Sequence, residues 1–357
     1  MDVFDGHNDL PWRLRVRDPA GRLDLAAELG GTGLHTDLPR LRRGGVGAQF
    51  WSVYVPNDRP EPQAAIQVVE QVELVRRIIA RYPGSLALAT NATEVEQARA
   101  DGRIASLLGA EGGHCLDNSL VVLRSLHKLG IRYLTLTHSH NTAWADSATD
   151  EPAHGGLTPF GEEVVRELNR LGMLADLAHV ADATMHAVLD ITTAPAFFSH
   201  SSARALCDHP RNVPDDVLLR VRDTEGVVMV TFVPFFLTDE CRAWGDELAR
   251  AEDAIALPWD SPDFLRARQA WIGANPCPPT SVRDVADHVE HVREVAGVDA
   301  VGLGGDYDGT EVVPDGLPDV SSYPALLDEL SARGWSDGDL RKLAWDNAMR
   351  VLRATCG

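Results

Sequence analysis

Short apolar runs alternate with amphipathic stretches along the whole chain. Several of these runs are apolar almost without interruption, which is typical of strands buried on both faces of a sheet. Eight runs qualify: 3–9, 47–55, 104–113, 132–139, 173–180, 194–200, 226–233 and 300–309. We therefore predict eight strands, separated by connections that are mostly long enough to hold a helix.

The connections carry apolar residues at three- and four-residue spacing and end in helix-stop signals. The clearest connection spans 158–172, because Thr158-Pro159 supplies a capping residue followed by proline in the first turn, and Gly172 ends the pattern. The same reasoning predicts helices over 63–82, 119–130, 213–226, 323–334 and 336–355.

The order of strand then helix, repeated eight times, predicts an α/β protein with a parallel sheet. Eight such units in about 300 residues suit a closed (β/α)₈ barrel, a TIM-like fold. An open doubly wound sheet is the alternative, and the absence of a GxGxxG sequence after the first strand weakens it. We expect one domain over residues 1–357, with an insertion at about 238–296 after the seventh strand and a C-terminal helix at about 336–355.

The composition of the chain argues against nucleic acid and membranes as binding partners. The 357 residues carry a formal charge of −20, which opposes binding to nucleic acid. The five cysteines are scattered and form no CxxC pair, so neither a disulfide scaffold nor a zinc knuckle is expected. No apolar run of about 18 residues occurs, and the first residues lack a basic and apolar leader. We therefore expect a cytoplasmic protein that contacts no membrane.

Polar side chains gather at one place on the predicted strands, which is the C-terminal end. These residues are His7 and Asp9 on the first strand, Glu111 on the third, His138 on the fourth, His179 on the fifth, His200 on the sixth and Asp306 on the eighth. The C-terminal ends of barrel strands converge on one face, where such enzymes place their chemistry. We predict that these seven side chains meet there.

The residue types favour a pair of divalent cations. His7 and Asp9 are two residues apart, so both side chains point to the same side of a strand. Imidazole nitrogens and carboxylate oxygens suit zinc or a similar ion, and His179 and His200 offer two more nitrogens. A carboxylate between these two pairs could bridge ions about 3.5–4 Å apart.

Glu111 is the candidate for that bridge. Many metal-dependent barrels use a carboxylated lysine at the end of the fourth strand, but the two lysines of this chain, Lys128 and Lys342, fall in predicted helices. Glu111 lies on a strand between the two pairs of candidate ligands. Its neighbours include Gly109 and Gly112, which we expect to let a metal ion or substrate approach closely.

Seven stretches between residues 5 and 309 form a distinctive set: DGHNDLPW, GAEGG, LTHSHNTAWADS, LAHV, FSHSSARAL, HPRNVPDD and GLGGDYDG. With LAWDNAMRVL near the C-terminus, the chain resembles the membrane (renal) dipeptidase family, zinc peptidases of the amidohydrolase superfamily. It departs from the family's pattern at His140 and at 231–234, a segment that we expect to line the substrate pocket.

The resemblance implies two Zn²⁺ ions per chain. His7, Asp9 and Glu111 would hold the first ion. Glu111, His179 and His200 would hold the second, so that Glu111 bridges the two.

The resemblance also implies three roles around the reacting bond. His138 would hydrogen-bond the scissile carbonyl oxygen, Arg211 would bind the C-terminal carboxylate of the substrate, and Asp306 would transfer the proton. Asp308 is an alternative to Asp306 for proton transfer. We favour Asp306 because it directly follows the apolar run. His140 is an alternative to His138, because both point to the same side of an extended strand.

We therefore expect metal-assisted hydrolysis of dipeptides, including those with a C-terminal D-residue, as the resemblance implies. A second hypothesis keeps the metals and changes the substrate, giving an N-acyl amino acid deacetylase or a lactonase. A third is a barrel that binds a ligand without catalysis, and the apparently complete set of ligands with Asp306 argues against it. The resemblance also allows a homodimer.

Overall fold

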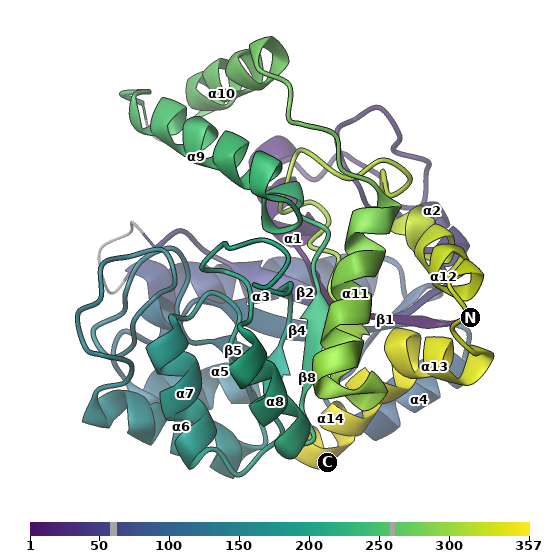
Figure 1. Cartoon of the computed structure of the whole chain (residues 1–357). Coiled ribbons are helices and arrows are strands. Elements are labelled where there is room, and N and C mark those ends of the chain that lie inside the picture. The colour runs from purple at the N-terminus through teal and green to yellow at the C-terminus, as the bar shows by residue number, and fades with distance from the viewer. Residues whose placement is uncertain (58–62, 258–260) are drawn as a thin grey trace.

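Nine strands define the centre of the molecule within residues 1–57, 63–257 and 261–357, the part of the chain that the computed structural model describes. The strands are β1 (Val3–Asn8), β2 (Val46–Tyr54), β3 (Leu86–Leu88), β4 (Ile104–Glu111), β5 (Ile131–Thr135), β6 (Leu174–Asp176), β7 (Phe197–Phe198), β8 (Val227–Val230) and β9 (Val301–Leu303). Eight of them pair in the order β1–β2–β4–β5–β6–β7–β8–β9, and β9 pairs back to β1. Every pair in this ring is parallel, which confirms the predicted (β/α)₈ barrel (Figure 1).

Each strand of the ring overlaps one of the eight predicted apolar runs. β7 is the shortest, with two residues, and β6 has three, because the chain leaves the sheet before it reaches His179 and His200. The three-residue β3 was not predicted, and it pairs with the start of β4 outside the ring. So short an element carries too little periodicity to be separated from a loop by its sequence.

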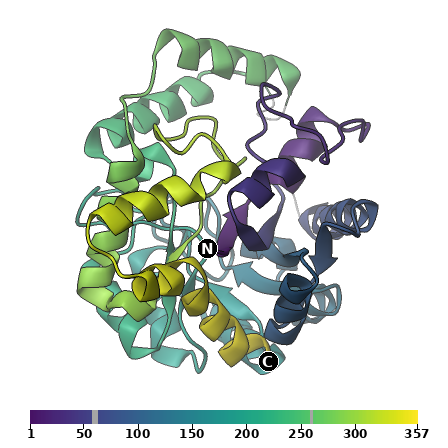
Figure 2. The same cartoon turned by 90° about the vertical axis from the view of Figure 1, so that its right-hand side faces the viewer.

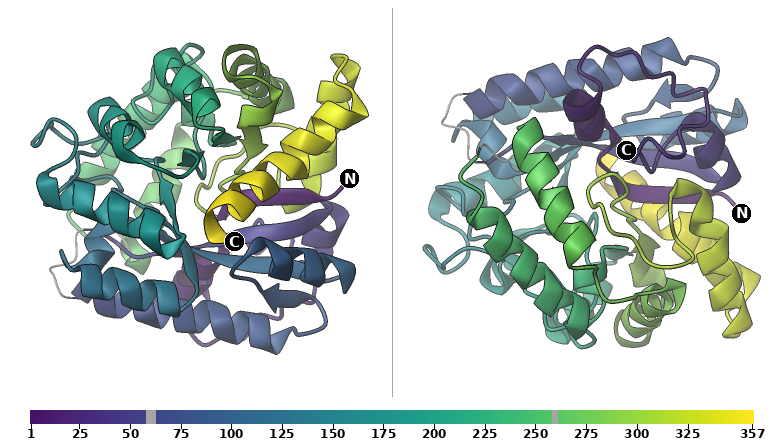
Figure 3. Two further views of the ribbon diagram at one scale, coloured as in Figure 1. Left: turned by 90° about the horizontal axis from the view of Figure 1, so that it is seen from below. Right: turned by 90° about the horizontal axis from the view of Figure 1, so that it is seen from above.

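Helices surround the ring and cover both of its ends (Figures 2 and 3). The helices are α1 (Leu10–Arg17), α2 (Leu38–Arg43), α3 (Gln63–Arg81), α4 (Ala92–Ala100), α5 (Leu120–Lys128), α6 (Pro159–Leu171), α7 (Asp182–Ile191), α8 (Asp215–Asp223), α9 (Asp239–Asp253), α10 (Pro262–Ala274), α11 (Val282–Ala296), α12 (Tyr323–Ala332), α13 (Asp337–Arg341) and α14 (Asn347–Cys356). At the lower end, α14 packs against β1, β6, β8 and β9. Among the described residues, no helix has the length and apolar character needed to cross a bilayer.

Local signals in the sequence set the ends of α6. The side chain of Thr158 accepts a hydrogen bond from the backbone N–H of Gly161, and Pro159 occupies the first turn. Gly172 ends the helix at a φ of 70°, a left-handed conformation that glycine adopts without steric cost.

The predicted helix at 336–355 is interrupted in the structure. It consists of α13, a π-helical turn at Lys342–Asp346 and α14. Such a turn inserts one extra residue into a helix, which a pattern of apolar spacing does not reveal. The ring of Trp345, in this turn, lies 5.9 Å from the ring of Phe4 at the bottom of the barrel.

The helices α9 and α10, which we call the cover helices, stand above the upper end of the ring in Figures 1 and 2. Both fall within the predicted insertion at about 238–296. The third helix of that range, α11, packs against β8, β9, α8 and α12, so it serves as the crossover helix between β8 and β9. The single-domain organisation stays a prediction.

Aromatic side chains fill the interior of the ring. Phe4, Phe50, Tyr133 and Phe197 are buried, and the ring centroid of Phe50 lies 4.9 Å from that of Tyr133. Burial of one such ring contributes about 1.5–3 kcal/mol to stability. The interior is therefore a packed core, and the hydroxyl of Tyr133 reaches from it to His7.

Candidate metal centre and active site

The polar residues predicted at the strand ends meet at the carboxyl end of the ring. The pairing register places Tyr54, Glu111, Thr135 and Asp176 side by side across β2, β4, β5 and β6, so these strand ends are level. Candidate ligand atoms lie within 4.8 Å of one another in three groups: His7, Glu111 and His200; Glu111, His138 and His179; and His7, Asp9 and Asp306. All seven predicted residues are thus brought together.

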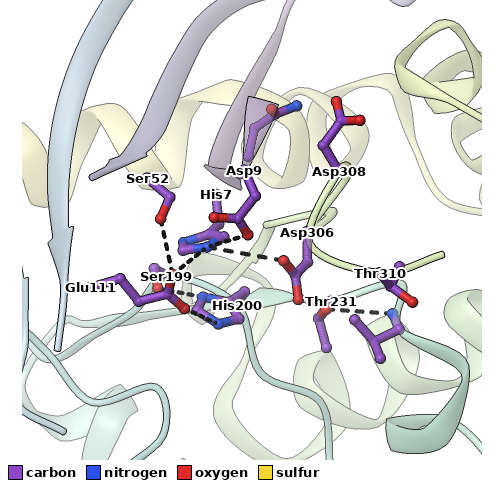
Figure 4. Close-up of polar contacts among 12 residues, drawn as sticks. His7, Asp9, Ser52, Glu111, Ser199, His200, Thr231, Asp306, Asp308 and Thr310 are labelled. Atoms are coloured by element: carbon purple, nitrogen blue, oxygen red, sulfur yellow. Dashed lines mark hydrogen bonds and ion pairs between the residues drawn. The ribbon is translucent and has the colours of Figure 1, made fainter. Parts of the chain in front are cut away.

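The carboxylate of Glu111 lies between two sets of side chains, of which Figure 4 shows Ser52, His7 and His200. Its Oε2 atom is 3.4 Å from Nε2 of His7 and accepts a hydrogen bond of 2.9 Å from Oγ of Ser52. Its Oε1 atom is 3.1 Å from Nε2 of His179 and 3.5 Å from Nε2 of His200. Each carboxylate oxygen therefore faces a different set of nitrogens, as a ligand bridging two cations must.

The protonation states of His179 and His200 suit a cation. Burial, with help from Arg211, lowers the pKa of His179 well below its usual range, and burial with His7 nearby does the same for His200. The two neutral rings turn their Nε2 atoms toward each other at 3.0 Å. A divalent ion that accepts both lone pairs explains this arrangement.

A buried carboxylate oxygen of Asp9 also indicates a cation site. Oδ1 of Asp9 is buried and has no hydrogen-bond partner among the described residues, while its Oδ2 lies 3.3 Å from Nε2 of His7. Because an unpartnered buried carboxylate oxygen is costly, the site fits a divalent cation that this oxygen would bind.

A second layer of side chains orients the candidate ligands. Nδ1 of His200 lies 2.7 Å from Oγ of Ser199, which donates a hydrogen bond of 2.6 Å to Oδ2 of Asp176. Since that hydroxyl donates to Asp176, Nδ1 of His200 carries the proton and its Nε2 lone pair faces the site. The ring of His7 is positioned by the hydroxyl of Tyr133, which lies 2.8 Å from its Nδ1.

Sequence reasoning missed this second layer. One signal was available, because Asp176 is an acidic residue inside the apolar run 173–180 and is completely buried. A buried carboxylate needs partners, and those of Asp176 include the Ser199 and Thr135 hydroxyls, the latter at 2.5 Å. Tyr133 carried no such signal, because tyrosine is common in strands.

The backbone of His179 is strained at the site. Its φ is 68°, a left-handed value that non-glycine residues rarely adopt. Its carbonyl accepts hydrogen bonds from the hydroxyl of Thr137 at 3.0 Å and from the backbone N–H of Ala148 at 2.8 Å. These bonds hold the conformation that turns the imidazole toward Glu111.

The structure separates Asp306 from Asp308. Oδ1 of Asp306 lies 3.9 Å from Nε2 of His7, and a Cβ on Gly309 would lie only 2.2 Å from that oxygen. Asp308 turns away, and its Oδ1 accepts a hydrogen bond of 2.8 Å from the backbone N–H of His35. Asp308 therefore stabilises the loop, while Asp306 faces the cluster.

Nearby carboxylates change the acidity of Asp306. Burial, opposed by His7 but reinforced by Asp9 and Glu111, raises the pKa of Asp306 well above its usual range. For Glu111 the balance is reversed, because His7 and His179 outweigh burial and bring its pKa well below the usual range. The pKa values of these two carboxyl groups are therefore shifted in opposite directions, so that Asp306 accepts a proton more readily and Glu111 stays ionised.

His138 and His140 are separated as well. Nε2 of His138 lies 3.7 Å from Oε1 of Glu111, and its ring stacks on that of His179 with centroids 4.3 Å apart. His140 is 63% exposed and points to Asp150. The sequence argument assumed that both histidines lie on the same side of one extended strand. The strand β5 ends at Thr135, before either histidine, so that assumption does not hold.

Arg211 is a buried cation close to the cluster. Its Nη2 donates to the carbonyl of His200 at 3.3 Å, its Nη1 approaches Oγ of Ser201 at 3.4 Å, and it lies over the ring of Phe236. Its Nε is buried without a partner among the described residues. Burial, partly offset by Asp306 and other carboxylates, lowers the pKa of Arg211 to about 10, so it remains charged at neutral pH. Such a cation suits an anionic ligand group.

These residues open into a cavity of about 500 Å³. Val233, Phe235 and Phe236 line it, so the predicted pocket segment 231–234 reaches the cavity through Val233. The cover helices contribute further wall residues, among them Phe264 and Arg268. The wall of the cavity therefore combines apolar and charged side chains with the candidate metal ligands.

The glycines near Glu111 serve a different purpose from the one predicted. A Cβ on Gly109 would lie 1.9 Å from the ring of Tyr133, and a Cβ on Gly112 would lie 2.4 Å from the ring of His114. Protein side chains fill that space, so the prediction that these glycines admit a metal ion or substrate is wrong. The absence of a side chain at Gly109 instead makes room for the ring of Tyr133, which lies against β4.

The sequence of this chain is similar to those of known peptidases. A family model described as "Membrane dipeptidase (Peptidase family M19)" matches residues 1–356. Dipeptidase 3 of Mus musculus is 41% identical over 356 residues, covering 98% of this chain and 64% of that protein. The chain thus spans less than two thirds of that relative's length. An uncharacterized dipeptidase of Schizosaccharomyces pombe is 39% identical over 369 residues, covering 99% of this chain and 80% of that protein.

Two solved structures are similar over nearly their full length. A structure described as dipeptidase AC, a metallo peptidase, is 28% identical with a TM-score of 0.83, covering 100% of this chain and 99% of its own. A metallo peptidase from Rhodobacter sphaeroides, liganded with a phosphinate mimic of the dipeptide L-Ala-D-Ala, is 27% identical with a TM-score of 0.82 and 99% coverage of both chains.

Proposed function

Because the chain belongs to the membrane dipeptidase family, peptidase family M19, we propose that it is a dinuclear zinc dipeptidase. The reaction is hydrolysis of the single peptide bond of a dipeptide. The observation that carries this proposal is the carboxylate of Glu111, whose two oxygens face His7 on one side and His179 with His200 on the other.

Two Zn²⁺ ions are the proposed cofactors. His7 and Asp9 would hold one ion and His179 and His200 the other, with Glu111 shared between them. Bound there, zinc supplies a Lewis acid and lowers the pKa of water to about 7. The Ser199–Asp176 and Tyr133 contacts keep the imidazoles in the orientation that binding needs.

The protein's own groups act around the peptide bond. Arg211 binds the C-terminal carboxylate of the substrate, which explains a preference for dipeptides over longer chains. His138 donates a hydrogen bond to the carbonyl oxygen as negative charge develops on it. Asp306 takes up a proton at its carboxylate and returns it to the leaving amine.

The substrate class extends to dipeptides with a C-terminal D-residue. The Rhodobacter sphaeroides relative binds a mimic of L-Ala-D-Ala and shares 27% identity with this chain over 99% of its length. Arg211 fixes the carboxylate, and the cavity of about 500 Å³ leaves room for either configuration at the neighbouring carbon.

The test of this function is a substrate panel on zinc-loaded protein. Dipeptides with L- and D-residues at the C-terminus are compared with N-acyl amino acids and lactones, which represent the alternative amidohydrolase activities. We expect turnover of dipeptides at least about 100-fold above the other classes in kcat/KM, because only dipeptides meet both Arg211 and the metal centre. Faster hydrolysis of lactones or N-acyl amino acids would replace this function with one of those alternatives.

Replacing Arg211 should separate free from amidated substrates. The Arg211→Ala variant is expected to raise KM for free dipeptides by about 100-fold, as loss of a paired charge–charge contact of about 3 kcal/mol implies. Amidated dipeptides lack the carboxylate, so their KM should change little. Arg222→Ala, on the surface beside Asp223, is the matched control. Equal effects of Arg211→Ala on both substrates would remove the carboxylate-binding role.

Location in the cytoplasm and assembly as a homodimer stay predictions. They would be tested by cell fractionation and by the mass of the protein in solution. Neither bears on the chemistry of the barrel.

A further inference from the structure

Two thiols meet where the cover helices join the barrel. Cys241 lies in the first turn of α9, and Cys277 lies in the segment between α10 and α11. Their Sγ atoms are 3.5 Å apart. A disulfide bond is about 2.05 Å long, so a movement of about 1.5 Å would join them.

Neighbouring contacts already hold these two segments together. The indole N–H of Trp244, one turn after Cys241, donates a hydrogen bond of 2.7 Å to the carbonyl of Asn275. The thiol of Cys241 also lies 3.2 Å from the carbonyl of Pro278. The thiols are thus brought together by their surroundings on both sides, and a bond between them would require little rearrangement.

The two thiols differ in exposure and acidity. Cys241 is buried and Cys277 is partly exposed. The hydrogen bond from Cys277, which outweighs burial, lowers the pKa of Cys241 to about 7. Cys241 is therefore substantially a thiolate at neutral pH, which is the reactive form.

The remaining cysteines lack this arrangement. Burial raises the pKa of Cys115, Cys207 and Cys356 to about 12 each. Cys207, although it lies near α9, directs its thiol to the carbonyl of Phe235 at 3.7 Å. These three thiols are expected to stay reduced.

We propose that Cys241 and Cys277 form an oxidation site that a low-molecular-weight disulfide, such as glutathione disulfide, converts to an intramolecular disulfide. The thiolate of Cys241 attacks one sulfur of glutathione disulfide, forming a mixed disulfide and releasing one glutathione thiolate. The thiol of Cys277 then loses its proton to solvent and attacks Sγ of Cys241, which releases the second glutathione thiolate. Two protein thiols lose their protons and are oxidised, and one glutathione disulfide is reduced to two thiols.

This bond would join the two ends of the segment that carries the cover helices. Those helices supply Phe264 and Arg268 to the wall of the cavity. At its far end the segment is held by ion pairs of Arg268 with Glu252 and with Glu311, the latter in the loop after β9. Oxidation would therefore hold the cover helices where they join the barrel, and the ion pairs of Arg268 hold them at their far end. The inference does not depend on which substrate the cavity binds.

The test equilibrates the metal-loaded protein in glutathione buffers from reducing to oxidising composition. We expect the five titratable thiols of the unfolded chain to fall to three, with a Cys241–Cys277 cross-linked peptide in a non-reduced digest. The unfolding midpoint should rise by several degrees, because the bond closes a loop in the unfolded chain. Dithiothreitol should reverse both changes, and zinc content should be the same in both forms.

Variants make the assignment specific. Cys207→Ser is the matched control and should still lose two thiols on oxidation, whereas Cys277→Ser and Cys241→Ser should form no intramolecular bond. A thiol count that stays at five in the oxidising buffer would overturn the proposal. So would a cross-linked peptide that contains Cys207 in place of Cys277.

Discussion

The Glu111→Gln variant is expected to hold no more than one zinc ion per chain tightly and to lose turnover by about 10⁴-fold, equivalent to about 5.5 kcal/mol of transition-state stabilisation. The substitution keeps the shape of the side chain, but an amide has one acceptor oxygen and one NH₂ group. It can face a cation on only one side, whereas the carboxylate faces His7 through one oxygen and His179 through the other. One of the two candidate metal positions therefore loses its shared ligand.

Metal content and dipeptide turnover measured on the same sample check this prediction. Glu163→Gln, at an exposed position of α6, is the matched control and should retain both properties. A Glu111→Gln protein with two tightly held zinc ions and parental turnover would show that this carboxylate does not link the two positions. The melting temperature of each variant excludes general unfolding as the cause.

The Asp306→Asn variant is expected to keep its zinc and to lose turnover by about 10²–10⁴-fold, the usual contribution of a general acid–base group. The amide cannot accept and return a proton, although it fills the same space beside His7. KM should change less than kcat, because the carboxylate acts in the reaction and contributes less to binding.

Asp308→Asn provides the comparison for Asp306→Asn within the same loop. The carboxylate of Asp308 accepts a hydrogen bond from the backbone of His35, so its loss should lower stability slightly and leave the chemistry largely intact. If Asp308→Asn abolished turnover while Asp306→Asn did not, the roles of the two aspartates would be exchanged. A parental rate in both variants would remove proton transfer from this loop altogether.

The ring of strands and its cluster of ligands could be predicted because both depend on short-range patterns. Near-continuous apolar runs mark strands buried on both faces, and a polar residue at the end of each run marks the carboxyl end of the barrel. His179 and His200 follow the very short strands β6 and β7, yet the apolar runs before them were clear enough to place both.

Features that depend on exact backbone geometry could not be predicted. His138 and His140 seemed equivalent on an extended strand, but β5 ends at Thr135 and the loop turns only His138 toward Glu111. The reason for Gly109 was missed too, because the sequence does not show that the ring of Tyr133 lies against β4 there.

Contacts between distant segments were equally hidden. Ser199 is adjacent to His200 in sequence, but its link to Asp176 becomes visible only when β6 and β7 are side by side. The thiols of Cys241 and Cys277 are separated by two helices, and no spacing rule pairs them. Such contacts depend on the path of the connections, which the sequence pattern determines only loosely.

The central claim is that one carboxylate holds two cations side by side beneath the substrate. Its most direct test is a titration of metal-free protein with Zn²⁺ in which bound zinc and dipeptide turnover are followed together. We predict that turnover reaches its maximum only when two ions are bound per chain. Full turnover at one ion per chain, or in protein that contains no transition metal, would contradict the account.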